Sequence, residues 1–348
     1  MTTVPPSGAG RQAAARTGPH QPGRAVPPAG DAVLLINPRS GGGKAERVGL
    51  ARECTARGIE PVLLRPGQDV VALAEAAVAG GAEVIGMAGG DGSLALVAGV
   101  AARNAVPMVV VPAGTRNHLA MDLGLDRDDV TGALDAYGAA VERAVDLGDV
   151  NGRAFVNNVS LGLYAQIIRS PAYRDAKVDT TLSALPGLLG PGSRPFDLRF
   201  ADPDGMPHIG AHVVQVSNNR YGRTAGTLTS RPRLDSGRLG VIALQLPEGP
   251  PEPAVLGAIA RDRPDRLRGF AAWEAPTFEV DSGDAVDAGV DGEALRLAPP
   301  LRFAIRPAAL RVRLPRHASG LSPAAREQRA RARLRGLPPR RAAVRRRP

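Results

Sequence analysis

Residues 83–93 read Glu-Val-Ile-Gly-Met-Ala-Gly-Gly-Asp-Gly-Ser, an apolar stretch that runs directly into a glycine-rich turn around one carboxylate. Short apolar runs bounded by turn residues are typical of buried strands. A helical stretch follows, up to about Arg103. The segment therefore predicts a strand, a tight turn and a helix in succession, which is the unit of an open parallel sheet with crossover helices.

The same alternation extends on both sides of this unit. Its other members are the apolar runs 32–36, 61–64 and 107–111 and the helical stretches near 45–57 and 70–79. They predict a doubly wound parallel α/β domain over residues 31–145. After about residue 140, strand-like segments are separated by Gly, Pro, Asp and Asn, and they predict an antiparallel β domain over residues 146–315.

The two ends of the chain differ from these domains. Residues 1–30 are rich in Pro, Gly and Ala without apolar periodicity, which predicts a disordered segment. Residues 316–348 hold 11 Arg and one Glu, and they predict a disordered or helical tail. This tail accounts for the whole formal charge of +10, so the rest of the chain is neutral. A nucleic-acid partner is therefore not expected, also because the tail lacks interleaved aromatic residues.

The single cysteine, Cys54, excludes an internal disulfide and any multi-cysteine zinc or iron–sulfur site. We expect it to be a small buried side chain. No apolar run approaches the roughly 18 residues that span a bilayer. Residues 1–30 lack the apolar core of a signal peptide, so we expect a cytoplasmic protein.

Three glycine-rich turns follow predicted strands, at the edge where open parallel sheets bind ligands. They are Asn37–Lys44, Gly89–Ser93 and Pro112–Ala120. Glycines let backbone N–H groups approach a phosphate, and a helix N-terminus adds a favourable dipole.

The turn Gly89–Ser93 gives the strongest indication of function, because an ordinary Asp-Gly turn needs only one glycine. We expect its backbone to contact a polyphosphate, Asp91 to face magnesium or a hydroxyl, and Ser93 to cap the next helix. Taken alone, Asn37–Lys44 is as consistent with a plain flexible turn as with phosphate binding, and for Pro112–Ala120 a capped helix start is slightly favoured. For His118, a polar neighbour or cap is favoured over a proton carrier.

Carboxylates also flank a glycine in Asp291-Gly292-Glu293, and Asp146 and Asp149 lie near the start of the second predicted domain. Carboxylates of this kind are common in hairpin turns, so alone they do not indicate a site.

Taken together, these motifs resemble, in order and spacing, the diacylglycerol kinase catalytic-domain family, and more narrowly its bacterial soluble lipid kinases. The resemblance covers residues 31–315. It includes Phe155–Gly162, which is similar to the family's phenylalanine-asparagine strand, and Arg231–Leu239, which is similar to its Asp-Gly-x-Leu segment.

The resemblance implies an α/β nucleotide domain and a β-sandwich domain, with ATP and a lipid meeting in the cleft between them. It implies that Asp91 contacts magnesium or nucleotide and that Asp291 is the leading candidate for the base, with Asp91 as its rival. Glu293 is a further catalytic candidate, and Asp146 is a second metal candidate. The residues that would hold the ATP phosphates are Asn37, Ser40, Gly41, Gly42, Gly89, Gly90, Asp91, Gly92, Ser93, Gly114, Thr115 and Asn117.

The chain departs from the family pattern at two positions. His118 stands where the family often has Asp, and Ser236 replaces the second Asp of a paired Asp-Asp-Gly, which weakens the inference of a structural magnesium site. The first departure keeps open the alternative of a nucleotide-binding protein that has lost catalysis. A second alternative, an NAD-kinase-like soluble metabolite kinase, is disfavoured because its motif partners are absent.

The function expected from this resemblance is an ATP- and magnesium-dependent lipid kinase acting on diacylglycerol, a sphingoid base or a related lipid. The apolar stretch 180–192 either borders an acyl-chain entrance or packs in the core. Expected partners are a lipid at a membrane surface, an anionic membrane bound through the Arg-rich tail, and a second copy of the chain in a homodimer. The tail would place the protein at the inner face of the plasma membrane.

Overall fold

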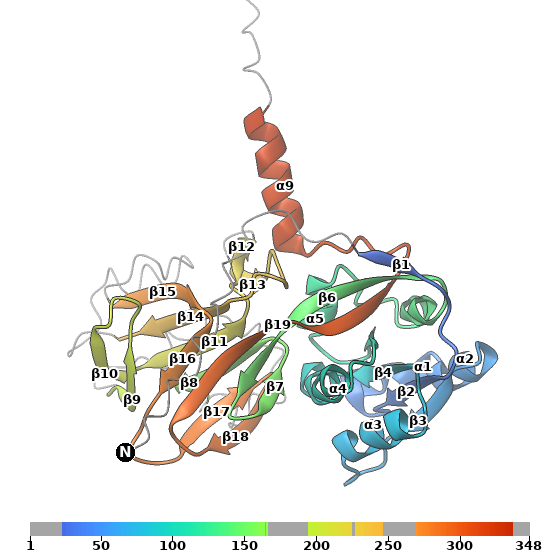
Figure 1. Ribbon diagram of the computed structural model, residues 1–348, viewed down its shortest axis with the longest axis horizontal. Coiled ribbons are helices and arrows are strands. Elements are labelled where there is room, and N and C mark those ends of the chain that lie inside the picture. Colours follow the sequence, from blue (N-terminus) through green and yellow to red (C-terminus); the bar gives the residue numbers. More distant parts are fainter. Residues whose placement is uncertain (1–22, 164, 166–193, 225–226, 246–268, 337–348) are drawn as a thin grey trace, which may run out of the picture.

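The computed structural model describes residues 23–163, 165, 194–224, 227–245 and 269–336 of the 348-residue chain. Its strands form two large sheets and two short hairpins (Figure 1). The apolar stretch 180–192, considered above as an entrance for acyl chains, lies outside the described residues.

The first sheet contains the predicted parallel strands in the order β5-β4-β2-β3. Their residues in β2, β4 and β5 are all buried, as expected for strands covered on both faces. The strands are β2 (Ala32–Ile36), β3 (Glu60–Leu63), β4 (Val84–Gly89) and β5 (Met108–Pro112).

Helices cover both faces of these parallel strands. They are α1 (Lys44–Arg47), α2 (Leu50–Ala56), α3 (Val70–Ala79), α4 (Asp91–Arg103), α5 (His118–Asp122) and the 3-10 helices η1 (Ser40–Gly42) and η2 (Gly132–Tyr137). On one face Leu35 and Met87 share a core with α3 and α4, and on the other Leu34 shares a core with α1, α2 and η2. The doubly wound arrangement predicted from the sequence is therefore confirmed.

Local sequence explains two details of these helices. The helix predicted near 45–57 is divided into α1 and α2 at Gly49, whose φ of 61° does not continue a right-handed helix. Asp69 begins α3 by accepting the backbone N–H of Val71 at 2.8 Å. Cys54 is buried in α2, as expected, and burial raises the pKa of its thiol to about 11.

Antiparallel strands extend the first sheet beyond its parallel part. The long C-terminal strand β19 (Leu301–Pro315) pairs parallel with β5 and antiparallel with β6 (Ala140–Val150). The boundary predicted at residue 145 thus falls inside β6. The short strands on this sheet are β1 (Arg24–Val26), β7 (Arg153–Phe155) and β16 (Thr277–Val280).

The strand β1 corrects the prediction of disorder for residues 23–30, the described part of the segment 1–30. Arg24–Val26 pair antiparallel with β6, and Val26 is buried. The guanidinium of Arg313 also donates to the carbonyl of Pro27 at 2.7 Å. This segment is ordered by contacts with residues far along the chain, which its own composition does not reveal.

The second large sheet is antiparallel and has the order β15-β14-β11-β8-β17-β18. Val159, Leu161 and Val241 from this sheet share a core with Phe303 of β19 and Phe155 of β7, which confirms the expected all-β part. Its strands are β8 (Asn158–Gly162), β11 (Val213–Asn218), β14 (Leu239–Leu244), β15 (Phe270–Ala275), β17 (Val286–Val290) and β18 (Glu293–Leu297). The hairpins are β9 (Phe196–Ala201) with β10 (Pro207–Ala211), and β12 (Gly222–Thr224) with β13 (Thr227–Ser230).

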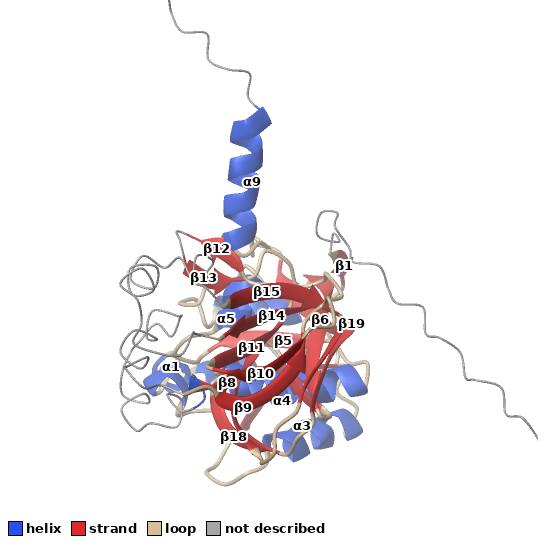
Figure 2. Cartoon of the chain, turned by 90° about the vertical axis from the view of Figure 1, so that its left-hand side faces the viewer, coloured by secondary structure: helices blue, strands red, loops and turns tan. Residues whose placement is uncertain are grey.

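The last described element is α9 (Pro323–Gly336), which forms part of the predicted tail and is helical. It projects from the region of β12 and β13, as both views show (Figures 1 and 2). Among the described residues, no helix combines the length and the apolar character needed to cross a bilayer.

Candidate functional site

The three glycine-rich turns predicted to bind phosphate meet at the carboxyl edge of the parallel strands. A Cβ placed on Gly114 would lie 2.4 Å from the Cα of Gly90, and one on Gly41 would lie 2.5 Å from the carbonyl oxygen of Ala113. Only glycine allows backbone segments to approach so closely. Gly41 has a φ of 56°, and the next two residues, Gly42 and Gly43, also lie in the left-handed region with φ of 67° and 83°. Gly90, by contrast, faces open space, with no atom within 4 Å of a Cβ placed there.

Asp91 joins two of these turns. It is the first residue of α4, and its carboxylate accepts the backbone N–H of His118 at 3.0 Å and of Leu119 at 3.2 Å. These two amides begin α5, so Asp91 caps that helix. The His118 Nδ1 lies 3.7 Å from Asp91 Oδ2, which makes His118 a polar neighbour of this carboxylate.

The side chains of Ser93 and Asn117, which were predicted to cap a helix and to contact phosphate, both bond to the backbone of these turns. Gly90 is the N-cap of α4, and the Ser93 hydroxyl donates to the carbonyl of Gly90 at 2.9 Å, so the prediction that Ser93 caps this helix is wrong. Asn117 is buried, and its side chain makes two hydrogen bonds, 3.0 and 2.7 Å long, with the backbone of Gly114.

The other predicted ATP-binding residues lie at the same edge. Asn37 Oδ1 accepts the N–H of Arg39 at 3.1 Å at the end of β2. Ser40, Gly41 and Gly42 form η1. Thr115 is exposed after Gly114.

Asp291 lies in the other half of the protein, directly after β17. It adopts a left-handed φ of 48°, and its carboxylate accepts three backbone N–H groups, from Val156 at 2.8 Å, Asn157 at 2.8 Å and Asn158 at 3.1 Å. The pKa of Asp291 is raised to about 7, because burial and, less strongly, the negative charge of Asp91 raise it by more than the three amide hydrogen bonds lower it. Asp291 is thus a carboxyl group that can exchange a proton near neutral pH.

Glu293 brings the two halves into contact. Its carboxylate is 2.9 Å from the Arg153 guanidinium, and a Cβ on Gly92 would lie 2.5 Å from Glu293 Oε1. The fold therefore brings the Asp-Gly-Glu turn, predicted to be functional only on resemblance, against the first turn of α4.

Arg231 supports the segment that holds Asp291, and sequence reasoning gave it no role. Its side chain is fully buried and forms an ion pair with Asp122, with Nε 2.7 Å from Oδ2. It also donates to the carbonyls of Val156 and Asn218 and, at 2.8 Å, to Asn157 Oδ1. The sequence shows Arg231 only as an arginine in the segment Arg231–Leu239 that resembles the family, and this does not reveal that its side chain is buried.

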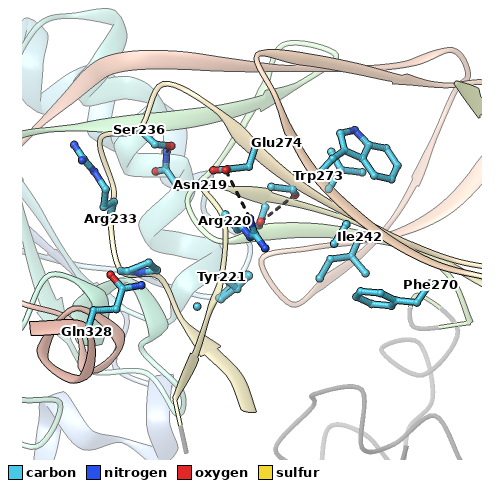
Figure 3. Close-up of a pocket in the computed structure, with 16 residues that line it drawn as sticks. Asn219, Arg220, Tyr221, Arg233, Ser236, Ile242, Phe270, Trp273, Glu274 and Gln328 are labelled. Atoms are coloured by element: carbon cyan, nitrogen blue, oxygen red, sulfur yellow. Dashed lines mark hydrogen bonds and ion pairs between the residues drawn. The ribbon is translucent and has the colours of Figure 1, made fainter. Parts of the chain in front are cut away.

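Tyr221 connects this network to a cavity. Its hydroxyl accepts a hydrogen bond of 3.1 Å from Asn158 Nδ2, and the Arg231 guanidinium lies 5.6 Å from its ring centre. Burial raises the pKa of Tyr221 to about 12. The cavity, of about 440 Å³, has apolar walls that include Ile242 and Trp273 (Figure 3).

Asp146, a predicted metal ligand, is engaged by N–H donors from three segments. Its carboxylate accepts from Asn219 Nδ2 at 2.8 Å, from Gly237 N at 2.6 Å and from Ala308 N at 2.8 Å. These hydrogen bonds show that Asp146 holds three segments of the chain together. Its role as a metal ligand stays a prediction.

Asp91 fits a magnesium ion better than Asp146 does. Magnesium usually retains several waters and is held by one or two carboxylates together with substrate phosphates. Asp91 lies between the glycine turns, and each of its oxygens accepts one amide and retains a further lone pair. The described residues contain no group of three or more His, Cys, Asp and Glu that could hold a metal ion.

Comparison with known proteins agrees with this geometry. Residues 31–150 match the model of the diacylglycerol kinase catalytic domain. A Pseudomonas aeruginosa protein named "Probable lipid kinase YegS-like" is 28% identical over 291 residues, or 81% of this chain and 94% of that protein. A protein of the same name from Pseudomonas syringae pv. tomato is 30% identical over 257 residues, or 71% of this chain and 81% of that protein.

The fold is also similar to a crystal structure of a diacylglycerol kinase from Bacillus anthracis. The TM-score is 0.60 at 16% sequence identity, and the match covers 82% of this chain and 96% of that one. The family model matches the part that carries the three glycine turns, and the 30% identical relative is matched over most of its length. The chain therefore belongs to the diacylglycerol kinase catalytic-domain family, whose members are lipid kinases.

Proposed function

We propose that this lipid kinase transfers the γ-phosphate of ATP to a lipid hydroxyl, with diacylglycerol or a sphingoid base as the acceptor class. The observation that carries the proposal is the contact between the Asp-Gly-Glu turn that holds Asp291 and the first turn of α4 that holds Asp91, where a Cβ on Gly92 would lie 2.5 Å from Glu293 Oε1. The pKa of Asp291 is raised to about 7. A carboxyl that titrates near neutral pH is suited to accept a proton in the transition state.

Backbone N–H groups, more than side chains, would contact the phosphates of ATP. Backbone N–H groups of the turns around Gly41 and Gly90 would hold the phosphates, with the N-terminus of α4 behind them, while Gly114, whose own N–H donates to Asn117, keeps the turns in close contact. Magnesium, when bound with ATP, neutralises charge on the β- and γ-phosphates. Asp91 would hold that ion while keeping α5 in place through its two amide bonds.

On the acceptor side, Asp291 would accept the hydroxyl proton while the hydroxyl oxygen bonds to the γ-phosphorus and ADP leaves. The three amides from Val156 to Asn158 fix the direction of this carboxylate. Glu293, held by Arg153 and packed on Gly92, would position Asp291 relative to α4.

Incubation with γ-labelled ATP and a panel of lipids tests the proposal. We expect label in a lipid hydroxyl acceptor such as diacylglycerol or sphingosine. Label in NAD and in no lipid would support a soluble metabolite kinase instead. ATP binding without transfer to any acceptor would support a protein that has lost catalysis, an alternative motivated by His118 in place of the family's Asp.

Activity should depend on pH through Asp291. Its pKa is raised in the folded protein, so below about 7 the carboxyl is protonated and cannot accept a proton. We expect kcat/KM to rise with pH up to an apparent pKa of about 7 and then to level off. The same shift means that the folded state loses stability as pH rises from the usual aspartate pKa through 7. A flat kcat/KM profile across this range would contradict the assignment of Asp291.

Two glycine substitutions should separate phosphate binding from folding. In Gly90→Ala the methyl group enters open space at an ordinary φ of −85°, so we expect an unchanged melting temperature. Because the methyl occupies the space proposed for phosphate, the KM for ATP should rise on the order of tenfold, as for loss of one charge-assisted hydrogen bond. The matched variant Gly114→Ala collides with backbone and should lower the melting temperature. Unchanged ATP kinetics in Gly90→Ala would remove this turn from the nucleotide site.

A further inference from the structure

Helix α9 is fixed to the body at its first turn and exposed beyond it. Ala324 and Ala325 are buried, with 1% and 5% of their surface exposed, whereas residues 328–333 are all exposed. Figure 2 shows the helix standing away from the sheets.

Specific hydrogen bonds hold the base of this helix. Ser322 caps it by accepting the N–H of Ala325 at 3.1 Å. The N–H of Ala324 donates to the Ser230 hydroxyl at 3.3 Å, and that hydroxyl donates to Asp122 at 2.8 Å. Asp122 is the buried partner of Arg231, so α9 is anchored on the network that supports the Asp291 segment. The projecting turns therefore have a defined direction relative to the body.

The projecting turns are cationic. Arg326, Arg329, Arg331 and Arg333 are exposed, and within the part of the chain that the structure describes only Arg331 has an acidic partner, Glu327. Residues 1–315 carry no net charge, so the positive charge of the protein is concentrated on α9 and on the sequence around it. The sequence after residue 336 adds further arginines.

We propose that α9 docks the protein on an anionic lipid surface through Arg326, Arg329 and Arg333. The inference rests on the proposed lipid acceptor, because an enzyme that phosphorylates a membrane lipid must meet the bilayer. Guanidinium groups form strong charge-assisted hydrogen bonds with phosphate oxygens. An anionic leaflet attracts each nearby arginine by about 1 kcal/mol, which is about fivefold in affinity.

The composition of α9 favours attachment at the headgroups over insertion. Its exposed residues 328–333 are Gln, Arg, Ala, Arg, Ala and Arg, which provide no large apolar face for burial in the acyl region. The same residues include no aromatic side chain that could stack on nucleic-acid bases. Docking of this kind is electrostatic, so it should weaken steeply as salt increases.

Docking through α9 would also bring a cavity to the lipid surface. Gln328 of α9 lines the same cavity of about 440 Å³ whose walls include Ile242 and Trp273 (Figure 3). The docking helix and the cavity thus share one side of the protein.

The test is the full-length variant Arg326→Gln/Arg329→Gln/Arg333→Gln, sedimented with vesicles of equal parts phosphatidylglycerol and phosphatidylcholine. Arg and Gln have similar helix propensities, so α9 should remain folded, which circular dichroism checks. We expect wild-type protein to bind these vesicles and not pure phosphatidylcholine, and the variant to bind about a hundredfold more weakly. The readout needs no catalysis, so a failed kinase assay would not affect it.

Two controls distinguish α9 from total charge. The variant with Lys at the same three positions should retain vesicle binding, because the leaflet senses charge. The variant Arg52→Gln/Arg65→Gln/Arg296→Gln removes three exposed charges elsewhere and should bind as wild type does.

Two results would overturn the proposal. The first is that the α9 Gln variant sediments as wild type does. The second is that a DNA duplex binds the protein more tightly than the vesicles do and the α9 Gln variant loses only that binding, which would assign the helix to nucleic acid.

Discussion

In Asp291→Asn, kcat should fall about 1,000-fold while the KM for ATP stays unchanged, because loss of a general base costs about 10²–10⁴-fold in rate. The side chain keeps its size, and its one amide oxygen can still accept the N–H groups of Asn157 and Asn158, whereas the NH2 group loses the bond from Val156. Burial disfavours the charged form of Asp291, which offsets part of this loss, so the melting temperature should fall only slightly. Steady-state kinetics and thermal unfolding of the same preparation would measure both effects.

Glu293→Gln is the matched control for this variant. It also removes one carboxylate from the Asp-Gly-Glu turn, but it leaves the three amide bonds of Asp291 intact. Since we assign Glu293 a positioning task through Arg153 and Gly92, its kcat should fall by about tenfold or less, a loss of about 1.4 kcal/mol. If Asp291→Asn retained more than about a tenth of wild-type kcat, the base would have to be sought at Asp91 instead.

Replacing Arg231 by Met should be the most destabilising single substitution among those considered. It leaves the Asp122 carboxylate buried without its cation, and it removes the donors to the carbonyls of Val156 and Asn218. Breaking a buried ion pair in this way costs about 3–5 kcal/mol. The melting temperature should therefore fall on the order of 10 °C, as measured by circular dichroism.

Two comparisons identify the cause of that loss. In the double variant Asp122→Asn/Arg231→Met the uncompensated charge is gone, so the melting temperature should lie above that of Arg231→Met alone. Arg103→Met breaks an ion pair with Glu75 whose side chains are about half exposed, and its effect should stay within about 1 kcal/mol. A double variant no more stable than Arg231→Met would show that lost packing and lost carbonyl donors, rather than the unpaired Asp122, set the cost.

The part of the fold that could be predicted from the sequence is the part built from local signals. Apolar runs and the turns after them located β2, β4 and β5, and the helical stretch 70–79 coincides with α3. The path of β19 could not be predicted in this way. Its pairing with β5 joins positions some 200 residues apart.

In the candidate site, too, the features with local sequence signals could be predicted and the long-range contacts could not. The glycine turns and the Asp-Gly-Glu turn were recognisable as motifs, and the fold brings Gly92 and Glu293 together. What holds Asp291 could not be predicted, because its amide donors lie about 135 residues before it. Ser93 was expected to cap α4, but its hydroxyl donates to the carbonyl of Gly90. The side chain of Asn117 bonds to the backbone of Gly114, and its contact with phosphate stays a prediction.

The strands β6 and β19 run through both hydrophobic cores. Phe303 and Ile305 of β19 belong to the core of the antiparallel sheet, whereas Leu310 and Val312 belong to that of the parallel sheet. The pairing of the two strands shifts register between Arg306 and Leu310, where Asp146 accepts the N–H of Ala308. The two halves are thus joined by a stiff ribbon with one irregular point, not by a loose linker. A rotation of one half against the other would meet least resistance where this strand pairing is irregular, so the hydrogen bond from Ala308 N–H to the Asp146 carboxylate would limit that rotation.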